Sequence, residues 1–182
     1  MIKRGDTIIE VILAVTIFSA VAVAALTLMN SGTAISQRSL ETTLVRHQVD
    51  SQAEMLRFIS SSTDPVFTEA WGSIKSRATS SPVTILDAET CPEVGGLNNP
   101  FVILPGGVNK LTVQNTFSGN PDTFARVTET SSQGISIQLA PISNTDGSVS
   151  AYDAYIQACW YGPGSSRPMT IGTIVRIYDT SN

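Results

Sequence analysis

The stretch GDTIIEVILAVTIFSAVAVAALTLMN, residues 5–30, decides how the rest of the chain is organised. After Glu10 this stretch carries no charged side chain, and the next charge along the chain is Arg38. Within residues 11–29 the only polar groups are three hydroxyls, which can bond back to carbonyl groups of their own helix. Such a helix covers about 28 Å, close to the ~30 Å hydrocarbon core of a bilayer. Because apolar residues occupy every face, we expect a membrane span.

A basic pair, Lys3-Arg4, precedes the apolar segment. Basic residues beside a span stay in the cytoplasm, so we expect the N-terminus inside and everything after Asn30 outside. One interpretation is a cleavable secretory signal, with small-residue cleavage sites at residues 20–22 and 22–24. Two features oppose a signal, because Glu10 interrupts its start and the apolar region continues past those sites.

The carboxylates at the start of the segment have a local explanation. Thr7 is placed to act as N-cap and Glu10 as the third helical residue, which together form a capping box. Asp6 and Glu10 also lie at the positive end of the helix dipole, where negative charge is stabilising. This explanation is compatible with a plain single-span anchor.

The sequence KRGDTIIEVILAVTIFS, residues 3–19, also resembles the N-terminus of type IV prepilins and pseudopilins. Their pattern is a short basic leader that ends in glycine, followed by an apolar segment whose fifth residue after that glycine is glutamate. Here the leader is residues 1–5, and Glu10 is the fifth residue after Gly5. The long helix expected beyond this motif extends the resemblance in general form.

The resemblance implies that a prepilin peptidase cuts between Gly5 and Asp6 and that the new N-terminus is methylated. It also implies that the Glu10 carboxylate pairs with the free α-amine of a neighbouring subunit and sets the register of packed helices. A carboxylate at the edge of an apolar span costs on the order of 2–3 kcal/mol if it is driven to the bilayer centre and less near the interface, which makes it a functional candidate. One departure is Asp6, because the first mature residue in the family is usually phenylalanine or another apolar residue.

The rest of the composition indicates an extracytoplasmic domain. The chain has 182 residues with 11 basic and 15 acidic side chains, a net charge of −4. It has no basic stripe, so nucleic acid is not an expected partner. After residue 30, polar uncharged residues and glycine dominate, and the only lysines are Lys75 and Lys110. We expect a β-rich domain outside the cytoplasm.

The first proline is Pro65, so a single helix can run from residue 6 to about residue 60, with residues 30–32 its only weak point. Past Thr33 the pattern becomes amphipathic, with apolar residues at spacings of three or four. This spacing predicts a stripe buried against a domain of the same chain. The stripe consists of Leu40, Leu44, Val45, Val49, Ala53, Leu56 and Ile59.

A short helical or irregular link is expected around residues 67–74, followed by strand-like runs separated by Gly, Pro, Asn and Asp turns. The runs are residues 83–86, 101–104, 111–117, 124–128, 135–139, 152–161 and 171–178. The predicted fold class is α+β, a long N-terminal helix packed on a C-terminal antiparallel β-sheet domain, as in pilins.

Four segments follow from this interpretation. Residues 1–5 form the leader, and residues 6–30 form the transmembrane half of the helix. Residues 31–62 form its amphipathic half. Residues 63–182 form the extracytoplasmic β-rich domain.

The chain has two cysteines, Cys91 and Cys159. In an exported domain such a pair favours one disulfide, whereas in a reducing cytoplasm the same residues are ordinary thiols. Cys159 lies in ACWYGPGSSRP, which indicates a core strand running into a Gly/Pro turn, or alternatively an exposed aromatic patch for contacts. Cys91 lies in a loop-like segment, so a bridge would tie a loop to the sheet and stabilise by about 4 kcal/mol.

Evidence for catalysis is weak throughout the sequence. His47 is the only histidine, which leaves no histidine metal cluster and no second candidate base. Asp87 and Glu89 could form a carboxylate pair, but loop acids are usually solvated. The run NTDG at residues 144–147 indicates a hairpin turn, because it lacks calcium-ligand spacing. We expect no enzymatic activity, no cofactor and no metal.

The functional expectation is a structural subunit of a type IV pilus or pilus-like filament, with a minor pilin preferred to a secretion or DNA-uptake pseudopilin. Its expected partners are other pilin subunits, a prepilin peptidase, the membrane assembly machinery and, before assembly, the lipid bilayer. The alternative is a membrane-anchored extracytoplasmic binding or adhesion domain that never polymerises.

Overall fold

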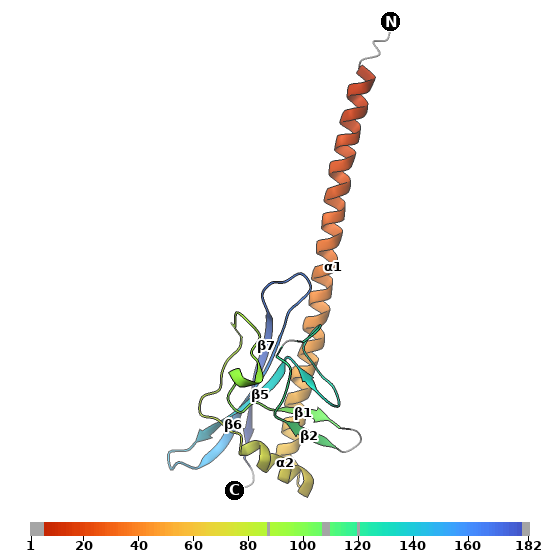
Figure 1. The fold of residues 1–182 in the computed structure, drawn as a ribbon. Helices are drawn as coiled ribbons and strands as arrows, with labels where there is room; N and C mark the ends of the chain where they lie inside the picture. Colours follow the sequence, from red (N-terminus) through yellow and green to blue (C-terminus); the bar gives the residue numbers. More distant parts are fainter. Residues whose placement is uncertain (1–5, 87, 107–109, 120, 180–182) are drawn as a thin grey trace. The chain divides into compact units, whose positions relative to one another are not determined.

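The computed structural model describes residues 6–86, 88–106, 110–119 and 121–179, and the side chains from Ile8 onward. The chain divides into two compact units, Met1–Ser39 and Leu40–Asn182. In its described part, the first unit consists of residues 6–39 of helix α1 (Asp6–Ser61), and the second contains the end of this helix and the other described elements (Figure 1). The fold class is α+β, one long N-terminal helix followed by small antiparallel sheets.

Helix α1 is uninterrupted, so the break considered at residues 30–32 does not occur. It ends at Ser61, a few residues before the first proline. Asp64 then caps a second helix, α2 (Pro65–Lys75), by accepting a hydrogen bond from the Val66 N–H at 2.9 Å. Proline suits the first helical position because its missing N–H is not needed there. The segment around residues 67–74, expected to be a short helical or irregular link, therefore lies within the regular helix α2.

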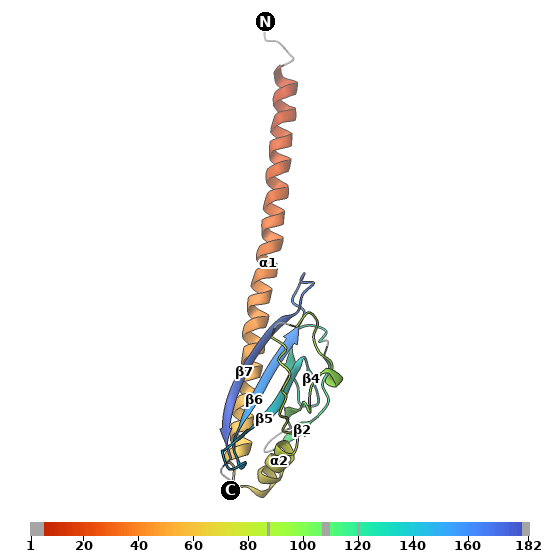
Figure 2. The same ribbon diagram turned by 90° about the vertical axis from the view of Figure 1, so that its left-hand side faces the viewer.

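The main sheet has three antiparallel strands in the order β5 (Ile135–Ser143), β6 (Val149–Trp160) and β7 (Met169–Tyr178). The turn between β5 and β6 contains the predicted NTDG hairpin, with Gly147 at φ 85°. Figure 2 shows the three strands side by side. The remaining elements are β1 (Val102–Pro105) paired with β2 (Leu111–Gln114), β3 (Arg126–Val127) paired with β4 (Ser132–Gln133), and the short 3-10 helix η1 (Val94–Gly96).

The part of α1 within the second unit buries one stripe against the sheet. Five predicted stripe residues are buried in the core, namely Val45, Val49, Ala53, Leu56 and Ile59. The prediction was wrong for Leu40 and Leu44, which are 60% and 38% exposed. In this part of α1 the contact with the sheet is polar: the indole N–H of Trp160 donates to Glu41 Oε2 at 3.1 Å.

Gln52 lies in the middle of the buried stripe, although it is polar, and is 1% exposed. Its amide nitrogen donates to the Ile103 carbonyl at 2.8 Å, and its amide oxygen accepts from the Ile103 N–H at 3.0 Å. The side chain thus acts as a strand neighbour for β1. It satisfies two backbone groups that would otherwise be buried without partners.

The prediction of a strand at residues 83–86 was wrong, because the structure has no strand there. This segment crosses the outer face of the sheet, opposite α1, and is held by side chains of the sheet. Gln138 donates to the Val83 carbonyl at 2.8 Å and accepts from its N–H at 3.1 Å. Gln157 donates to the same carbonyl at 2.9 Å and accepts from the Ile85 N–H at 2.7 Å. Side-chain amides replace the ladder that a strand would need.

Two other predicted strands are shorter than expected. The run at residues 111–117 is a strand only as far as Gln114, and the run at residues 124–128 only at Arg126–Val127. Their remaining residues have loop conformation, held by contacts such as the Ser118 N–H bond to the Ser132 carbonyl at 2.9 Å. The residue pattern of these runs did not show that each would find only a short partner strand.

Replacing Gln52 by methionine, which has a similar shape, should lower the free energy of unfolding by about 2–4 kcal/mol, because both Ile103 backbone groups lose their partner. Urea unfolding of the full chain in detergent measures this loss of stability, with the fluorescence of the buried Trp71 and Trp160 as the signal. The neighbouring exposed Ser51→Ala is the control. Equal stability of the two variants would contradict the strand-neighbour role of Gln52.

Candidate functional site

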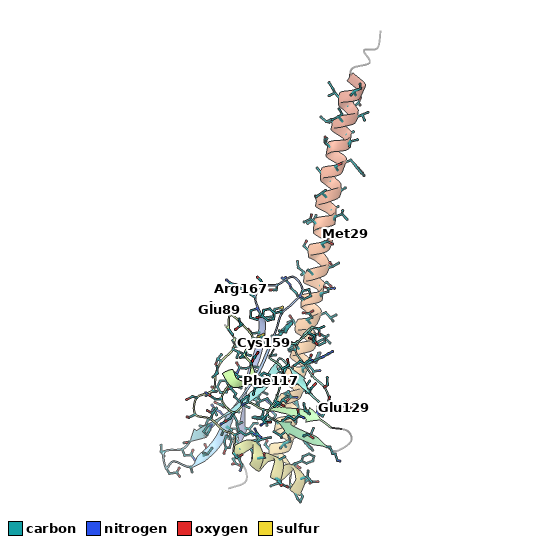
Figure 3. The ribbon with its side chains drawn as sticks, in the orientation of Figure 1. Met29, Glu89, Phe117, Glu129, Cys159 and Arg167 are labelled. Carbon is teal, nitrogen blue, oxygen red and sulfur yellow. A yellow bond between two sulfur atoms is a disulfide. The ribbon has the colours of Figure 1, made fainter. Side chains whose placement is uncertain are left out.

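The N-terminal half of α1 presents apolar side chains to its surroundings. From Ile8 to Met29, every described residue is exposed except the half-buried Ala22 (Figure 3). Phe18 is 75% exposed and Leu28 is 72% exposed. By length and composition this helix could cross a membrane, and none of its most apolar part is buried. Large exposed apolar surfaces mark contacts with lipid or with other proteins.

Both threonine hydroxyls of this segment are satisfied inside the helix. The hydroxyl of Thr16 donates to the Leu13 carbonyl at 2.8 Å, and that of Thr27 donates to the Val23 carbonyl at 2.9 Å. Neither hydroxyl therefore needs water. This arrangement suits an apolar environment, where an unsatisfied polar group is costly.

Glu10 is the exception. Its side chain is exposed on the first turns of α1, and from Ile8 onward no described residue forms an ion pair or side-chain hydrogen bond with it. It is the only ionisable residue in residues 8–37. A carboxylate beside an apolar span is stable at the water interface or next to a positive charge. Glu10 is therefore the group in this segment that can select a charged partner.

The other predicted N-terminal site residues fall at the limit of the described structure. Gly5 lies outside the described residues. Asp6 and Thr7 are the first residues of α1, and their side chains are outside the described part of the chain. The processing site and the Thr7 helix cap thus stay predictions.

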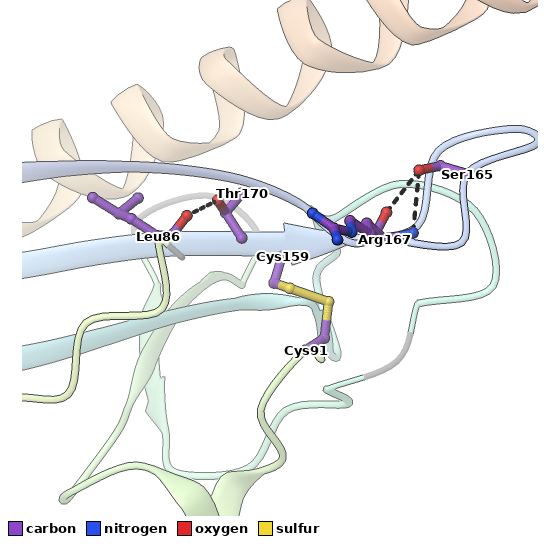
Figure 4. Close-up of a disulfide and its surroundings, with 6 residues drawn as sticks. All are labelled: Leu86, Cys91, Cys159, Ser165, Arg167 and Thr170. Atoms are coloured by element: carbon purple, nitrogen blue, oxygen red, sulfur yellow. Dashed lines mark hydrogen bonds between the residues drawn. A yellow bond between two sulfur atoms is a disulfide. The ribbon is translucent and has the colours of Figure 1, made fainter. Parts of the chain in front are cut away.

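A disulfide joins Cys91 to Cys159, with the two Cα atoms 5.5 Å apart (Figure 4). Cys159 is buried on β6, and Cys91 is half-buried in the loop before η1. Together with Ile85 and Leu97, Cys159 forms a small apolar cluster on the outer face of the sheet. The bridge ties the loop that contains Cys91 to β6. Such bonds persist in oxidising compartments.

The motif around Cys159 belongs to the core. Cys159 is 1% exposed and Trp160 is fully buried, as a core strand requires. The strand then leaves the sheet through a turn with Gly164 at φ 67°. The alternative of an exposed aromatic patch is wrong for Trp160, whereas Tyr161 is half-buried.

A cleft of about 700 Å³ lies between the end of α1, helix α2 and β2. Its walls are mostly apolar, and its charged residues are Glu54, Asp64 and Lys110. Glu54 forms an ion pair with Arg57, and Asp64 is occupied in capping α2. The cleft therefore offers no unengaged carboxylate among the described residues, and its polar groups indicate no particular ligand.

The remaining chemical candidates do not come together. His47 is exposed on α1, and Glu89 is exposed in a loop, while Asp87 lies outside the described residues. Across the described part of the chain, no three His, Cys, Asp or Glu residues are grouped so that they could hold a metal ion. The exposed apolar helix with Glu10 is thus the feature with the clearest functional chemistry.

No protein-family model, no curated protein and no solved structure matches this chain. The functional argument consequently depends on the residues themselves.

Loss of the disulfide should destabilise the second unit by about 4 kcal/mol, because a bridge between positions 68 residues apart restricts the unfolded chain. The measurement compares urea unfolding of the full chain in detergent before and after reduction. In the double variant Cys91→Ala/Cys159→Ala, the reductant should have no effect. If reduction left the unfolding midpoint of the unmodified chain unchanged, the stabilising role of the bridge would be refuted.

Proposed function

We propose that this chain is a structural subunit, most closely a minor pilin, of a type IV pilus or pilus-like filament. A prepilin peptidase removes residues 1–5, and the apolar half of α1 anchors the subunit in the membrane until assembly. In the filament the same apolar surface packs against the helices of other subunits. The β-rich domain lies outside the cytoplasm, on the filament surface.

The observation that supports this proposal best is the combination of an exposed apolar helix and one carboxylate. A plain anchor needs the apolar surface, and in it a carboxylate at this edge serves only to cap the helix. Cleavage after Gly5 would create an α-amine at Asp6 in each subunit. The Glu10 carboxylate of one subunit then pairs with the amine of its neighbour, and an unpaired carboxylate in that apolar setting would cost several kcal/mol. The pairing selects one axial stagger between helices.

The disulfide supports the proposed location. A bridge between Cys91 and Cys159 favours an oxidising compartment, as expected for a domain exported across the membrane. The basic pair Lys3-Arg4 on the other side of the span favours a cytoplasmic N-terminus.

The competing function is a membrane-tethered binding or adhesion domain that does not polymerise. Asp6 favours it, because an acidic residue at the new terminus would compete with Glu10 for the amine. In that case Glu10 serves only as the N-terminal helix cap.

The mass of the mature N-terminus separates these functions. We expect protein purified from cells to begin at Asp6, with or without a methyl group, because Gly5 provides the cleavage site. Mass spectrometry of the N-terminal peptide measures this directly. A chain that retains Met1 would support the tethered domain, and a start near Ala25 would indicate a secreted one.

Glu10→Ala and Glu10→Gln should both insert into the membrane normally but lose incorporation into filaments by on the order of tenfold or more, since both remove the charge. Immunoblots of sheared filaments and of membranes measure the two properties. Glu69→Gln, which neutralises an exposed acid on α2, is the matched control and should assemble normally. If Glu10→Gln assembled like the unmodified chain, the charge would be irrelevant and only a capping role would be left.

A further inference from the structure

Strand β7 forms one edge of the main sheet, and among the described residues it pairs only with β6. The opposite edge, at β5, is closed. There Ile137 exchanges two backbone hydrogen bonds with Phe101, at 2.8 and 2.9 Å. Leu139 accepts another from the Thr79 N–H at 2.7 Å. Within the described part of the chain, one edge of the sheet thus has backbone partners and the other has none.

The pairing identifies which backbone groups of β7 are free. In an antiparallel ladder, the N–H and C=O of a residue point to the same side, and successive residues alternate. The Cys159 N–H donates to the Gly134 carbonyl next to β5, so odd-numbered residues of β6 face β5. Even-numbered residues of β6 then face β7, where their partners are odd-numbered. The groups pointing away from the sheet belong to Thr170, Gly172, Ile174, Arg176 and Tyr178.

This edge lacks the devices that usually prevent pairing with other chains, which are lysine, proline and bulges. The strand, MTIGTIVRIY, contains no lysine or proline, and its register with β6 has no shift. Its one charge, on Arg176, is held by the Asp153 carboxylate at 2.9 and 3.0 Å. The hydrogen bond from Arg176 lowers the pKa of Asp153, so the pair stays ionised at neutral pH.

Two hollows adjoin the edge. On the outer face, a slot of about 320 Å³ with mostly apolar walls is lined by residues that include Leu86, Tyr155 and Ile174. Gly172 keeps the slot open, because an added Cβ would lie 3.2 Å from the Leu86 side chain. A groove of about 280 Å³ separates Tyr178 from the last turn of α1. Ile174 is 58% exposed and Tyr178 is 69% exposed, so apolar surface is available beside the free backbone groups.

We propose that the β7 edge is a docking site for an extended segment of a partner protein, which adds a fourth strand to the sheet. The segment exchanges backbone hydrogen bonds with Gly172, Ile174 and Arg176 and places an apolar side chain in the slot. Main-chain pairing supplies affinity in this type of recognition, and the pocket supplies selectivity. The segment is uncharged where it faces β7, because Asp153 already neutralises Arg176.

The test uses the full chain, labelled with ¹⁵N, in detergent micelles. The probe is a synthetic peptide of about ten residues, a usual strand length, with alternating threonine and valine and a lysine at each end. We expect saturable binding and slower amide exchange at Gly172, Ile174 and Arg176. Odd-numbered amides of β7 are already in the ladder and should not change. A peptide with N-methylated central residues cannot form the ladder and should not bind.

Two substitutions separate the backbone from the side chain. Ile174→Pro removes an N–H that points away from β6, so no existing ladder bond is lost, and peptide affinity should fall by about tenfold or more. Ile174→Thr keeps this N–H and shortens only the apolar contact, so affinity should fall by only about threefold. Thermal unfolding of each variant shows whether the sheet is intact.

Three results would overturn the proposal: no binding at peptide concentrations up to about 1 mM, equal affinity for the N-methylated peptide, or protection of other amides. Slow exchange at Gly172, Ile174 and Arg176 before peptide is added would also overturn it. In that case the edge is already paired with a second copy, and sedimentation would show a dimer. If Ile174→Pro fails to fold, the amide exchange of the unmodified chain still tests the proposal, because peptide must slow exchange at Gly172, Ile174 and Arg176 and not at the odd-numbered residues.

Discussion

Helix α1 must satisfy two different surroundings along one continuous element, and the rest of the structure depends on this constraint. Between Ile8 and Met29 most of its side chains are apolar and exposed, and the Thr16 and Thr27 hydroxyls are bonded back to the helix. Between Val45 and Ile59 only one stripe is apolar, and it is buried in the core of the second unit. Burial of apolar area is the main favourable term in folding, so this stripe determines which face of the sheet is the inner face.

Polar side chains join the layers of the second unit. Gln52 supplies α1 with a strand-like contact to β1, and Gln138 and Gln157 hold the segment at residues 83–86 on the outer face. A primary amide has one acceptor and two donor hydrogens, so it can match the N–H and C=O of a backbone. These contacts hold a short segment against the sheet without strand pairing, and within it Ile85 is buried. The disulfide from Cys159 to Cys91 ties the following loop to the same face of the sheet.

The two edges of the main sheet differ for a physical reason. Phe101 and Thr79 close the β5 edge, because the chain returns to that side through the segments that follow α2. No described segment pairs with the outer edge of β7, the last strand. An open strand edge is a template for pairing, and its sequence shows no feature that discourages a partner. The fold therefore presents two surfaces suited to partners, one apolar and helical and the other a β-edge.

The sequence alone determined whatever depends on local pattern. It indicated α1, the NTDG hairpin, the three main strands and Glu10 as the isolated charge, because each follows from periodicity, turn residues or an uninterrupted apolar run. Only the tertiary structure decided that residues 83–86 are not a strand, that Leu40 and Leu44 are exposed, and that Gln52 is buried. Those outcomes depend on contacts between residues far apart in the chain, such as Gln52 with Ile103, and a backbone group's partner cannot be derived from its neighbours in sequence. The open β7 edge is of the same kind, since an edge exists only once the strand order is known.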